Sequence, residues 1–346
     1  MEDSYTSTLP QNYFNDLYLK VSNVLKHRGN ICISVMYGFG NKTVFNFLTG
    51  QLEKNRLFDK IAVYDPTLDR VDPVKFVKSL ISKNKDENIL IVIRFFEQIK
   101  NKRNILEKLR NLQGQNLNNV SFLAISDHTP LLNPLDYSGK TTIFFSECVY
   151  LKPLTLNETK TMIKTITEYF GWKINKRDHQ KIYKLSGGIG RIIKYICREI
   201  SESATSAGQT DVFMKNMQIS FELDYLTKIL IAIPKNQLFL LGLTDKNNEI
   251  KSTLLRSYFK NYLSAEVIER YPNLSFTESR ILSFLLEYEN ETISLEKIAE
   301  IIDMSTENFS LWALYKTISR LKNKTKKSFK IINVKNKGYL LEKLIC

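Results

Sequence analysis

The chain has 346 residues, of which 43% are hydrophobic and 25% are charged. This balance is typical of a globular protein rather than a disordered or membrane-embedded one, and the length favours two or three domains. No apolar run reaches the ~18–20 residues that span a bilayer, and residues 1–11 are polar and acidic, unlike a secretory signal. We therefore expect a cytoplasmic protein that has no membrane partner.

Positive charge is concentrated towards the C-terminal end. The net charge of the chain is +14, and residues 306–346 hold ten lysines or arginines against Glu307 and Glu342, a net charge of +8. Such a segment favours polyanionic partners, because each neutralised phosphate releases condensed counterions.

Cysteine and histidine residues are few and scattered. The four cysteines and three histidines lie far apart in sequence, and no Cys-x-x-Cys pair or Cys/His cluster occurs. Zinc sites and dithiol sites need such spacing. We predict no metal site and no histidine-based catalytic dyad.

Residues 1–150 alternate short β-branched apolar runs with amphipathic stretches. This is the pattern of an α/β domain with a mostly parallel sheet. Helices are expected between the strands. The predicted strands are residues 31–37, 60–64, 88–94, 120–126 and 142–145.

Residues 151–205 change to helical periodicity, and we predict a helical lid there. The polar run 201–210 is predicted to be a linker. Residues 206–268 are interpreted as a connector, in which the apolar run 237–243 and the turn-rich segment 245–249 form a small hairpin.

Residues 269–346 carry the pattern of three helices followed by a hairpin. The first helix begins near Phe276, and the second follows Ser294, a suitable N-cap. The third, residues 307–322, is apolar on one side and basic on the other. The predicted hairpin consists of strand 329–334, turn 335–338 and strand 339–341.

This order is that of a helix-turn-helix with a wing, in which the third helix can enter the major groove while the hairpin contacts phosphates. Double-stranded DNA is therefore the expected partner of this segment. The residues predicted to contact DNA are Trp312, Lys316, Ser319, Arg320, Asn323, Lys324, Lys330, Lys335 and Lys337.

Three short motifs support a family resemblance. They are Leu-Ser-Phe-Thr-Glu-Ser-Arg-Ile-Leu at 274–282, Ile-Ser-Arg-Leu at 318–321, and Asn-Lys-Gly-Tyr-Leu at 336–340. With these motifs, residues 274–341 resemble the winged-helix output domain of OmpR-type response regulators. The resemblance implies DNA binding; the alternative is a winged helix that contacts protein and has a merely solvated basic face.

A loop at 38–43 has the strand and helix neighbours of a P-loop. A P-loop reads G-x-x-x-x-G-K-[ST], so that backbone N–H groups, a lysine and a hydroxyl meet the phosphates and Mg²⁺. Met36 and Asn41 stand where its glycines are expected. Binding of ATP or ADP and an unliganded helix N-terminus therefore stay equal alternatives. The candidate nucleotide-binding residues here are Gly38, Gly40, Lys42 and Thr43.

The strand 88–94 lies where a Walker B strand would end in two acidic residues. Those positions are Arg94 and Phe95, and neither side chain can bind Mg²⁺ or orient an attacking water. Glu97 comes two residues too late. We expect Arg94 at an exposed strand end, where Glu97 could pair with it, and we predict no catalytic residues.

Three further signals follow in chain order: Asp127 after the strand 120–126, Tyr-Leu-Lys-Pro-Leu-Thr at 150–155, and Leu-Ser-Gly-Gly-Ile-Gly-Arg at 185–191. With them, residues 13–205 resemble the ATPase core of the AAA+ and STAND class, in an initiator-like layout. The resemblance implies a sensor strand, a lid, and a place for Arg191 near the nucleotide. Residues 237–262 likewise resemble the small winged-helix-like piece that follows the lid in STAND proteins.

Together these features predict an α/β P-loop NTPase-like domain with a parallel sheet, followed by a helical lid and a C-terminal winged helix. The leading hypothesis is a DNA-binding regulatory or scaffold protein whose core has lost ATP hydrolysis. The alternatives are an active or nucleotide-switched ATPase and a winged-helix protein-interaction module. Protein partners and a homo-oligomer stay open.

Overall fold

The computed structural model describes residues 9–10, 13–84, 86–115, 119–140, 143–203, 206–301 and 311–344. The chain divides into two compact units, Met1–Leu254 and Leu255–Cys346. The division falls inside the segment 206–268. The finer boundaries expected at 150, 205 and 268 stay predictions.

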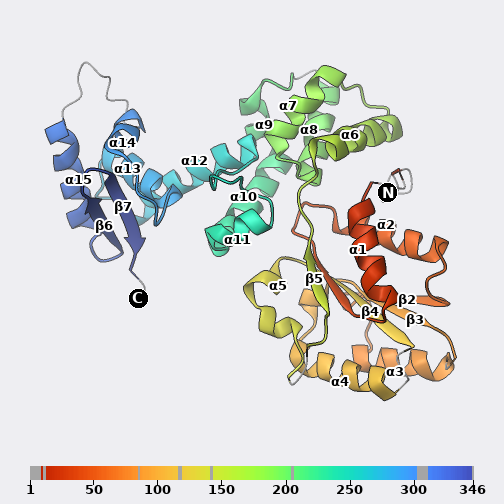
Figure 1. Ribbon diagram of the computed structural model, residues 1–346. Coiled ribbons are helices and arrows are strands. Elements are labelled where there is room, and N and C mark those ends of the chain that lie inside the picture. Colours follow the sequence, from red (N-terminus) through yellow and green to blue (C-terminus); the bar gives the residue numbers. More distant parts are fainter. Residues whose placement is uncertain are drawn as a thin grey trace. The chain divides into compact units, whose positions relative to one another are not determined.

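The first unit is built on a five-stranded parallel sheet with strand order β2-β3-β4-β1-β5 (Figure 1). The predicted α/β class with a parallel sheet is therefore confirmed. The strands are β1 (Ile31–Ser34), β2 (Lys60–Tyr64), β3 (Ile89–Ile93), β4 (Val120–Ser126) and β5 (Glu147–Tyr150).

The fifth predicted strand, residues 142–145, is wrong. The edge strand is instead β5, whose Cys148 pairs with Cys32 of β1. Residue 142 lies outside the described part of the chain. Phe144 and Phe145 are buried in the core cluster beside β3 and β4, so their apolar signal reports packing on the sheet rather than pairing in it.

Helices cover both faces of the sheet (Figure 1). On one face, Ile89, Ile91 and Ile93 of β3 pack in one core cluster with residues of α3 (Pro73–Lys83) and α4 (Lys102–Gln115). The opposite face is covered by α1 (Asn15–Lys26) and α2 (Asn41–Lys54). Alternate residues of a strand point to opposite faces, so a strand covered on both reads as a continuous apolar run.

Three short helices lie beside the carboxyl ends of the strands. They are η2 (Phe96–Gln98), α5 (Thr129–Leu132) and η3 (Pro134–Tyr137). Phe96 is fully buried, which anchors the chain directly after β3.

A helical segment follows the sheet, as the sequence indicates. It begins with α6 (Leu156–Phe170), whose start is fixed by a reciprocal capping box between Thr155 and Glu158. Gly188 has φ 82°, and a Cβ there would lie 2.1 Å from the carbonyl oxygen of Leu154. The turn at Gly188, between the last two helices of this segment, therefore needs glycine. The remaining elements are η4 (Lys176–Asp178), α7 (His179–Ser186) and α8 (Gly190–Ser203).

The hairpin predicted from residues 237–249 is wrong in its first strand. Those apolar residues begin inside α11 (Lys235–Leu240), with Pro234 at its N-cap. Only the Thr244–Ile250 bridge closes the turn that follows. A short apolar run does not distinguish strand from buried helix by periodicity, and here the proline sets the helix start. The neighbouring helices are α9 (Thr210–Lys215), α10 (Met217–Ala232) and α12 (Thr253–Arg270).

The second unit has its own core of three helices and a hairpin. Its elements after α12 are α13 (Phe276–Glu287), α14 (Leu295–Ile301), α15 (Leu311–Thr325), β6 (Phe329–Val334) and β7 (Gly338–Lys343). Residues 307–310 of the predicted third helix lie outside the described residues. The hairpin prediction is confirmed, and an antiparallel bridge joins Ile293 to Tyr339.

Candidate functional site

The glycine loop leaves the carboxyl end of β1 and enters α2, the edge where open α/β sheets bind ligands. Gly38 and Gly40 have φ of 83° and 99°, values that glycine adopts without strain. Gly40 is the N-cap of α2 and has no side chain that could cap the first turn. Met36, at the place of the first P-loop glycine, is buried.

A cavity of about 500 Å³ opens at this loop. It brings together all five residues that the sequence nominated for nucleotide binding. The lining residues are Leu9, Tyr13, Phe14, Gly38, Phe39, Gly40, Asn41, Lys42, Thr43, Arg94, Phe95, Leu154, Met162, Gly190, Arg191, Lys194 and Tyr195.

The charged side chains of this cavity are cationic. Lys42 lies in α2 and Arg94 directly follows β3, whereas Arg191 and Lys194 lie in α8. Among the described residues no aspartate or glutamate lines the cavity. The arrangement therefore favours an anionic ligand.

The exposure and the partner of the Arg94 side chain differ from those predicted from the sequence. This side chain is only 22% exposed, and its Nη1 lies 3.5 Å from Oδ2 of Asp65, not beside Glu97. The guanidinium lies over the rings of Phe45 and Phe95, at 4.6 and 4.9 Å from the centroids. Its Nε is buried without a hydrogen-bond partner. Sequence reasoning missed this contact, because Asp65 directly follows β2, a separate strand from the one that precedes Arg94.

Arg191 is held by residues from two other elements. Its Nη1 lies 3.0 Å from Oε1 of Glu222 on α10, and its guanidinium lies 4.3 Å from the ring centroid of Tyr37. The Arg191 backbone N–H donates to the carbonyl of Gly38 at 2.9 Å. Burial raises the pKa of Glu222, while the charge of Arg191 acts in the opposite direction. Part of the positive charge of Arg191 is therefore balanced inside the chain.

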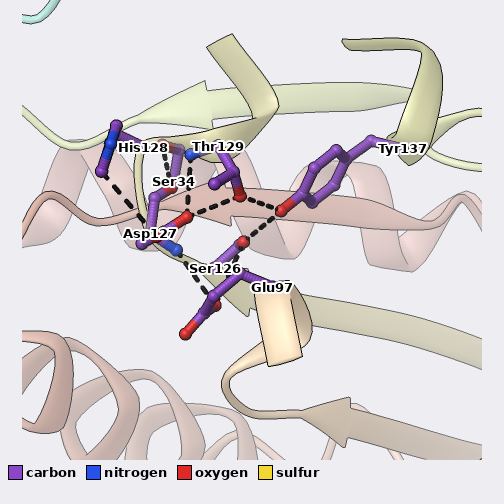
Figure 2. A network of polar contacts seen from close by, with 7 residues as sticks. All are labelled: Ser34, Glu97, Ser126, Asp127, His128, Thr129 and Tyr137. Carbon is purple, nitrogen blue, oxygen red and sulfur yellow. Dashed lines mark hydrogen bonds and ion pairs between the residues drawn. The ribbon is translucent and has the colours of Figure 1, made fainter. Parts of the chain in front are cut away.

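Glu97 reaches the sheet edge by a turn that sequence reasoning missed. Phe95 adopts the left-handed conformation, with φ 47°. After this turn, Oε2 of Glu97 accepts hydrogen bonds from the Ser126 hydroxyl at 3.3 Å and the Asp127 N–H at 3.2 Å (Figure 2). Burial and, less strongly, the charge of Asp127 raise the pKa of Glu97.

The same polar network extends along the end of β4 (Figure 2). The Ser34 hydroxyl donates to the carbonyl of Asp127 at 2.6 Å. A carboxylate oxygen of Asp127 accepts from the backbone and the hydroxyl of Thr129, at 2.8 and 2.6 Å. Tyr137 joins the Ser126 and Thr129 hydroxyls, and burial raises its pKa. These bonds fix Asp127 at the carboxyl edge of the sheet.

The second candidate site is the outer face of α15. Leu314, Ile318 and Leu321 are buried in the unit's core, while the opposite face is in solvent. Trp312 is 70% exposed, and the Lys316 ammonium lies 4.8 Å from its ring centroid. The structure thus leaves exposed on this face all the nominated residues between 312 and 323, namely Trp312, Lys316, Ser319, Arg320 and Asn323.

The nominated lysines outside that face differ in their surroundings. Lys335 and Lys337 are exposed at the turn between β6 and β7. Lys330 lies 3.9 Å from Glu342 across the hairpin, an exposed pair of little energetic value. Lys324 instead donates to the buried Glu278 carboxylate at 2.7 Å and to the carbonyl of Asn273 at 2.9 Å. Lys324 therefore has a structural role within the unit.

The described residues include no helix with the length and hydropathy of a membrane span. They also contain no group of three or more histidine, cysteine, aspartate or glutamate side chains placed to hold a metal ion.

Comparison with known proteins gives similarity at the level of structure alone. No protein-family model and no curated protein sequence matches the chain. Similar solved structures include RuvB of Thermotoga maritima, a Holliday junction branch migration motor, with 12% identity, TM-score 0.41, and coverage of 96% of this chain and 92% of that one.

Two others are named as DNA complexes. Orc1 of Aeropyrum pernix in complex with DNA has 13% identity, TM-score 0.40, and coverage of 94% and 87%. The replication initiator DnaA bound to AMPPCP and single-stranded DNA has 13% identity, TM-score 0.42, and coverage of 90% of each chain. These TM-scores are low, and the likeness assigns no function. The parallel sheet and the β1–loop–α2 unit are themselves the evidence that the first unit has a P-loop NTPase-like α/β fold.

Proposed function

We propose that this chain is a DNA-binding regulatory or scaffold protein built on an AAA+/STAND-like core that no longer hydrolyses ATP. Its second unit is a winged helix, and α15 is the recognition helix. The two-sided character of α15 carries the proposal. Leu314, Ile318 and Leu321 build the core, while Lys316 and Arg320 stand in solvent one helical turn apart.

The chemistry of this face suits a duplex. Arg320 can donate two parallel hydrogen bonds to a guanine edge or a phosphate, and Asn323 can donate to N7 of adenine while its side-chain oxygen accepts from the N6 amino group. Trp312 is exposed in the first turn of this helix, and Lys335 and Lys337 are exposed at the hairpin turn that follows the helix in sequence. We assign the helix to base and groove contacts and the turn lysines to phosphates.

The core supplies a nucleotide pocket without the acids of hydrolysis. Lys42 and Thr43 keep the P-loop chemistry at the start of α2, and ATP or ADP is the ligand we propose for the cavity. Arg94 and Phe95 occupy the Walker B acid positions, so no side chain there can hold Mg²⁺ or polarise water. Nucleotide would then act as a structural or switching ligand. Protein partners or self-association through this core remain compatible with it.

The DNA-binding proposal is tested by a matched pair of double variants. Lys316→Ala with Arg320→Ala removes two positive charges from the α15 face, and Lys108→Ala with Arg110→Ala removes two from exposed positions of α4 in the other unit. We expect the first to weaken binding of a fluorescent duplex by at least about tenfold, the equivalent of ~1.4 kcal/mol. The second should change it little. Equal affinities for both variants would refute the assignment.

A protein-interaction role is the second candidate, and a specific observation favours it. Leu311, Trp312 and Tyr315 expose apolar surface on α15, at 48%, 70% and 41%. A protein partner would bury such a patch. In that case Trp312→Ala would abolish partner binding, while duplex binding would be absent in the unmodified protein even at low salt.

Residual hydrolysis is the third candidate, because Glu97 lies at the carboxyl edge of the sheet. Glu97 is engaged by Ser126 and Asp127 and is not among the cavity-lining residues. We therefore expect no ATP turnover. Turnover that disappears in both Lys42→Ala and Glu97→Gln would establish this candidate instead.

A further inference from the structure

The cationic side chains that line the β1–α2 cavity restrict the form in which a nucleotide can bind. Lys42, Arg94, Arg191 and Lys194 line it, and among the described residues no carboxylate does. Mg²⁺ in a phosphate site is held by one or two carboxylates or hydroxyls together with phosphate oxygens. Here Thr43 offers one hydroxyl, and the charged side chains of the lining are all cationic, with Asp65 and Glu222 balancing part of the charge of Arg94 and Arg191 from outside the lining.

Arg94 stands at the end of β3 in a fixed position. Its backbone N–H donates to the carbonyl of Tyr64 at 2.9 Å. Its guanidinium packs against the rings of Phe45 and Phe95, with the Asp65 carboxylate beside it. A guanidinium held in this way is preorganised, because little side-chain entropy remains to be lost on binding.

The Asp65 contact does not use the whole guanidinium. At 3.5 Å from Nη1 to Oδ2 it is a loose ion pair, and Nε is buried with no hydrogen-bond partner. A buried donor that lacks a partner is destabilising and gains from any acceptor that reaches it. Phosphate oxygens are the acceptors that match the planar fork of arginine donors.

We propose that this cavity binds a nucleoside triphosphate free of metal, with the Arg94 guanidinium in the role that Mg²⁺ plays in ordinary P-loop sites. The inference rests on the proposed nucleotide pocket and names its ligand state. Lys42, the N–H groups at the start of α2, and Arg94 neutralise the phosphates together. A bound divalent ion would face Arg94 and lose affinity through like-charge repulsion.

The test is a calorimetric titration of the full chain with ATP, once in EDTA and once with Mg²⁺ in excess over ATP. An ordinary P-loop site binds the magnesium complex and weakens in EDTA. The metal-free site does the opposite: affinity in EDTA should be at least about tenfold higher than with Mg²⁺. Arg94→Ala should remove that preference and weaken binding in EDTA by about tenfold or more.

Two control variants distinguish the effect of losing the Arg94 guanidinium from an effect on folding. Arg110→Ala removes one exposed arginine of α4 and should leave both titrations unchanged. Arg94→Lys keeps the charge but loses the planar fork, so it should fall between the unmodified protein and Arg94→Ala. If the alanine variant fails to fold, Arg94→Lys serves in its place, because its side chain can still pack against Phe45 and Phe95.

Two outcomes would overturn the inference, and each identifies which part of it is wrong. If ATP binds and needs Mg²⁺, or if Arg94→Lys and Arg94→Ala bind like the unmodified protein in EDTA, the nucleotide pocket stands and the metal-free state is wrong. If the folded, unmodified protein binds neither ATP nor inorganic triphosphate in either buffer, the nucleotide pocket itself fails.

Discussion

The contact between Lys324 and Glu278 gives the sharpest prediction about the second unit. Glu278 is 2% exposed, and its Oε2 accepts from the Lys324 ammonium at 2.7 Å and from the Ser275 N–H at 2.7 Å. Replacing Lys324 by methionine keeps most of the apolar stem but leaves the carboxylate without its counter-charge. Glu278 also closes the capping box of α13, so the loss acts on the first helix of the unit.

The size of the effect follows from burial. Breaking a buried ion pair by removing one partner costs about 3–5 kcal/mol, and a hydrogen bond to a charged group is worth about 1.5–3 kcal/mol. Because the Lys324 side chain is 39% exposed, water can replace part of the lost contact. We therefore expect Lys324→Met to lower the free energy of unfolding of this unit by about 2–3 kcal/mol.

Native-state hydrogen exchange of the full chain measures this quantity directly. In Lys324→Met, the free energy of opening measured at amides of α13 and α15 should fall by about 2–3 kcal/mol. The values for the core strands β3 and β4 should stay unchanged. Lys322→Met, at an exposed position on the same helix, is the control and should shift exchange by less than about 0.5 kcal/mol. Equal protection in the two variants would refute a stabilising role for the pair.

The pH dependence of this difference has a definite sign. Burial acts to raise the pKa of Glu278, but the hydrogen bond from Lys324, the Ser275 N–H and the Lys324 charge outweigh it and hold that pKa below its usual range. A depressed carboxyl pKa stabilises the folded unit above the unfolded value of about 4.3, and this stabilisation is lost as the pH falls through the folded value. The gap between unmodified protein and Lys324→Met should therefore be constant near neutrality and shrink below about pH 4.

Two further substitutions follow from single contacts. Gly338 has φ 128°, and a Cβ there would lie 1.8 Å from the Ile293 carbonyl oxygen, so Gly338→Ala should destabilise the second unit by more than about 2 kcal/mol in hydrogen exchange; Gly114→Ala, with open space around it, is the control. Glu222→Gln removes the carboxylate that balances Arg191 and should tighten ATP binding by about tenfold in titration; unchanged affinity would place Arg191 outside the site.

Much of the fold could be predicted from the sequence, because the signals were local. The β3 run is apolar throughout, and the β4 run is apolar apart from Ser121 and Ser126, since both sheet faces are covered. The hairpin of the second unit has its turn residues in place. The failures at residues 142–145 and 237–243 have one cause. A short apolar run reports burial, and only the three-dimensional structure shows whether it is buried as a strand, a helix or a loop.

The candidate sites divide in the same way. The exposed face of α15 follows from helical periodicity, and the structure brings the P-loop remnant and Arg191 to one cavity. The surroundings of Arg94 could not be predicted, because Asp65 and Phe45 come from other elements. The position of Glu97 depends on the left-handed backbone of Phe95, a conformation that few non-glycine residues adopt.

The salt dependence of duplex binding tests the proposed function most directly. Anisotropy titrations of the full chain with a duplex, between about 50 and 200 mM salt, should give a straight line of log affinity against log salt, with a slope of about −0.9 for each phosphate contacted. In Lys316→Ala with Arg320→Ala the slope should become shallower by about 1–2. A duplex that fails to bind at the lowest salt, or a slope identical in the variant, would contradict DNA binding by α15.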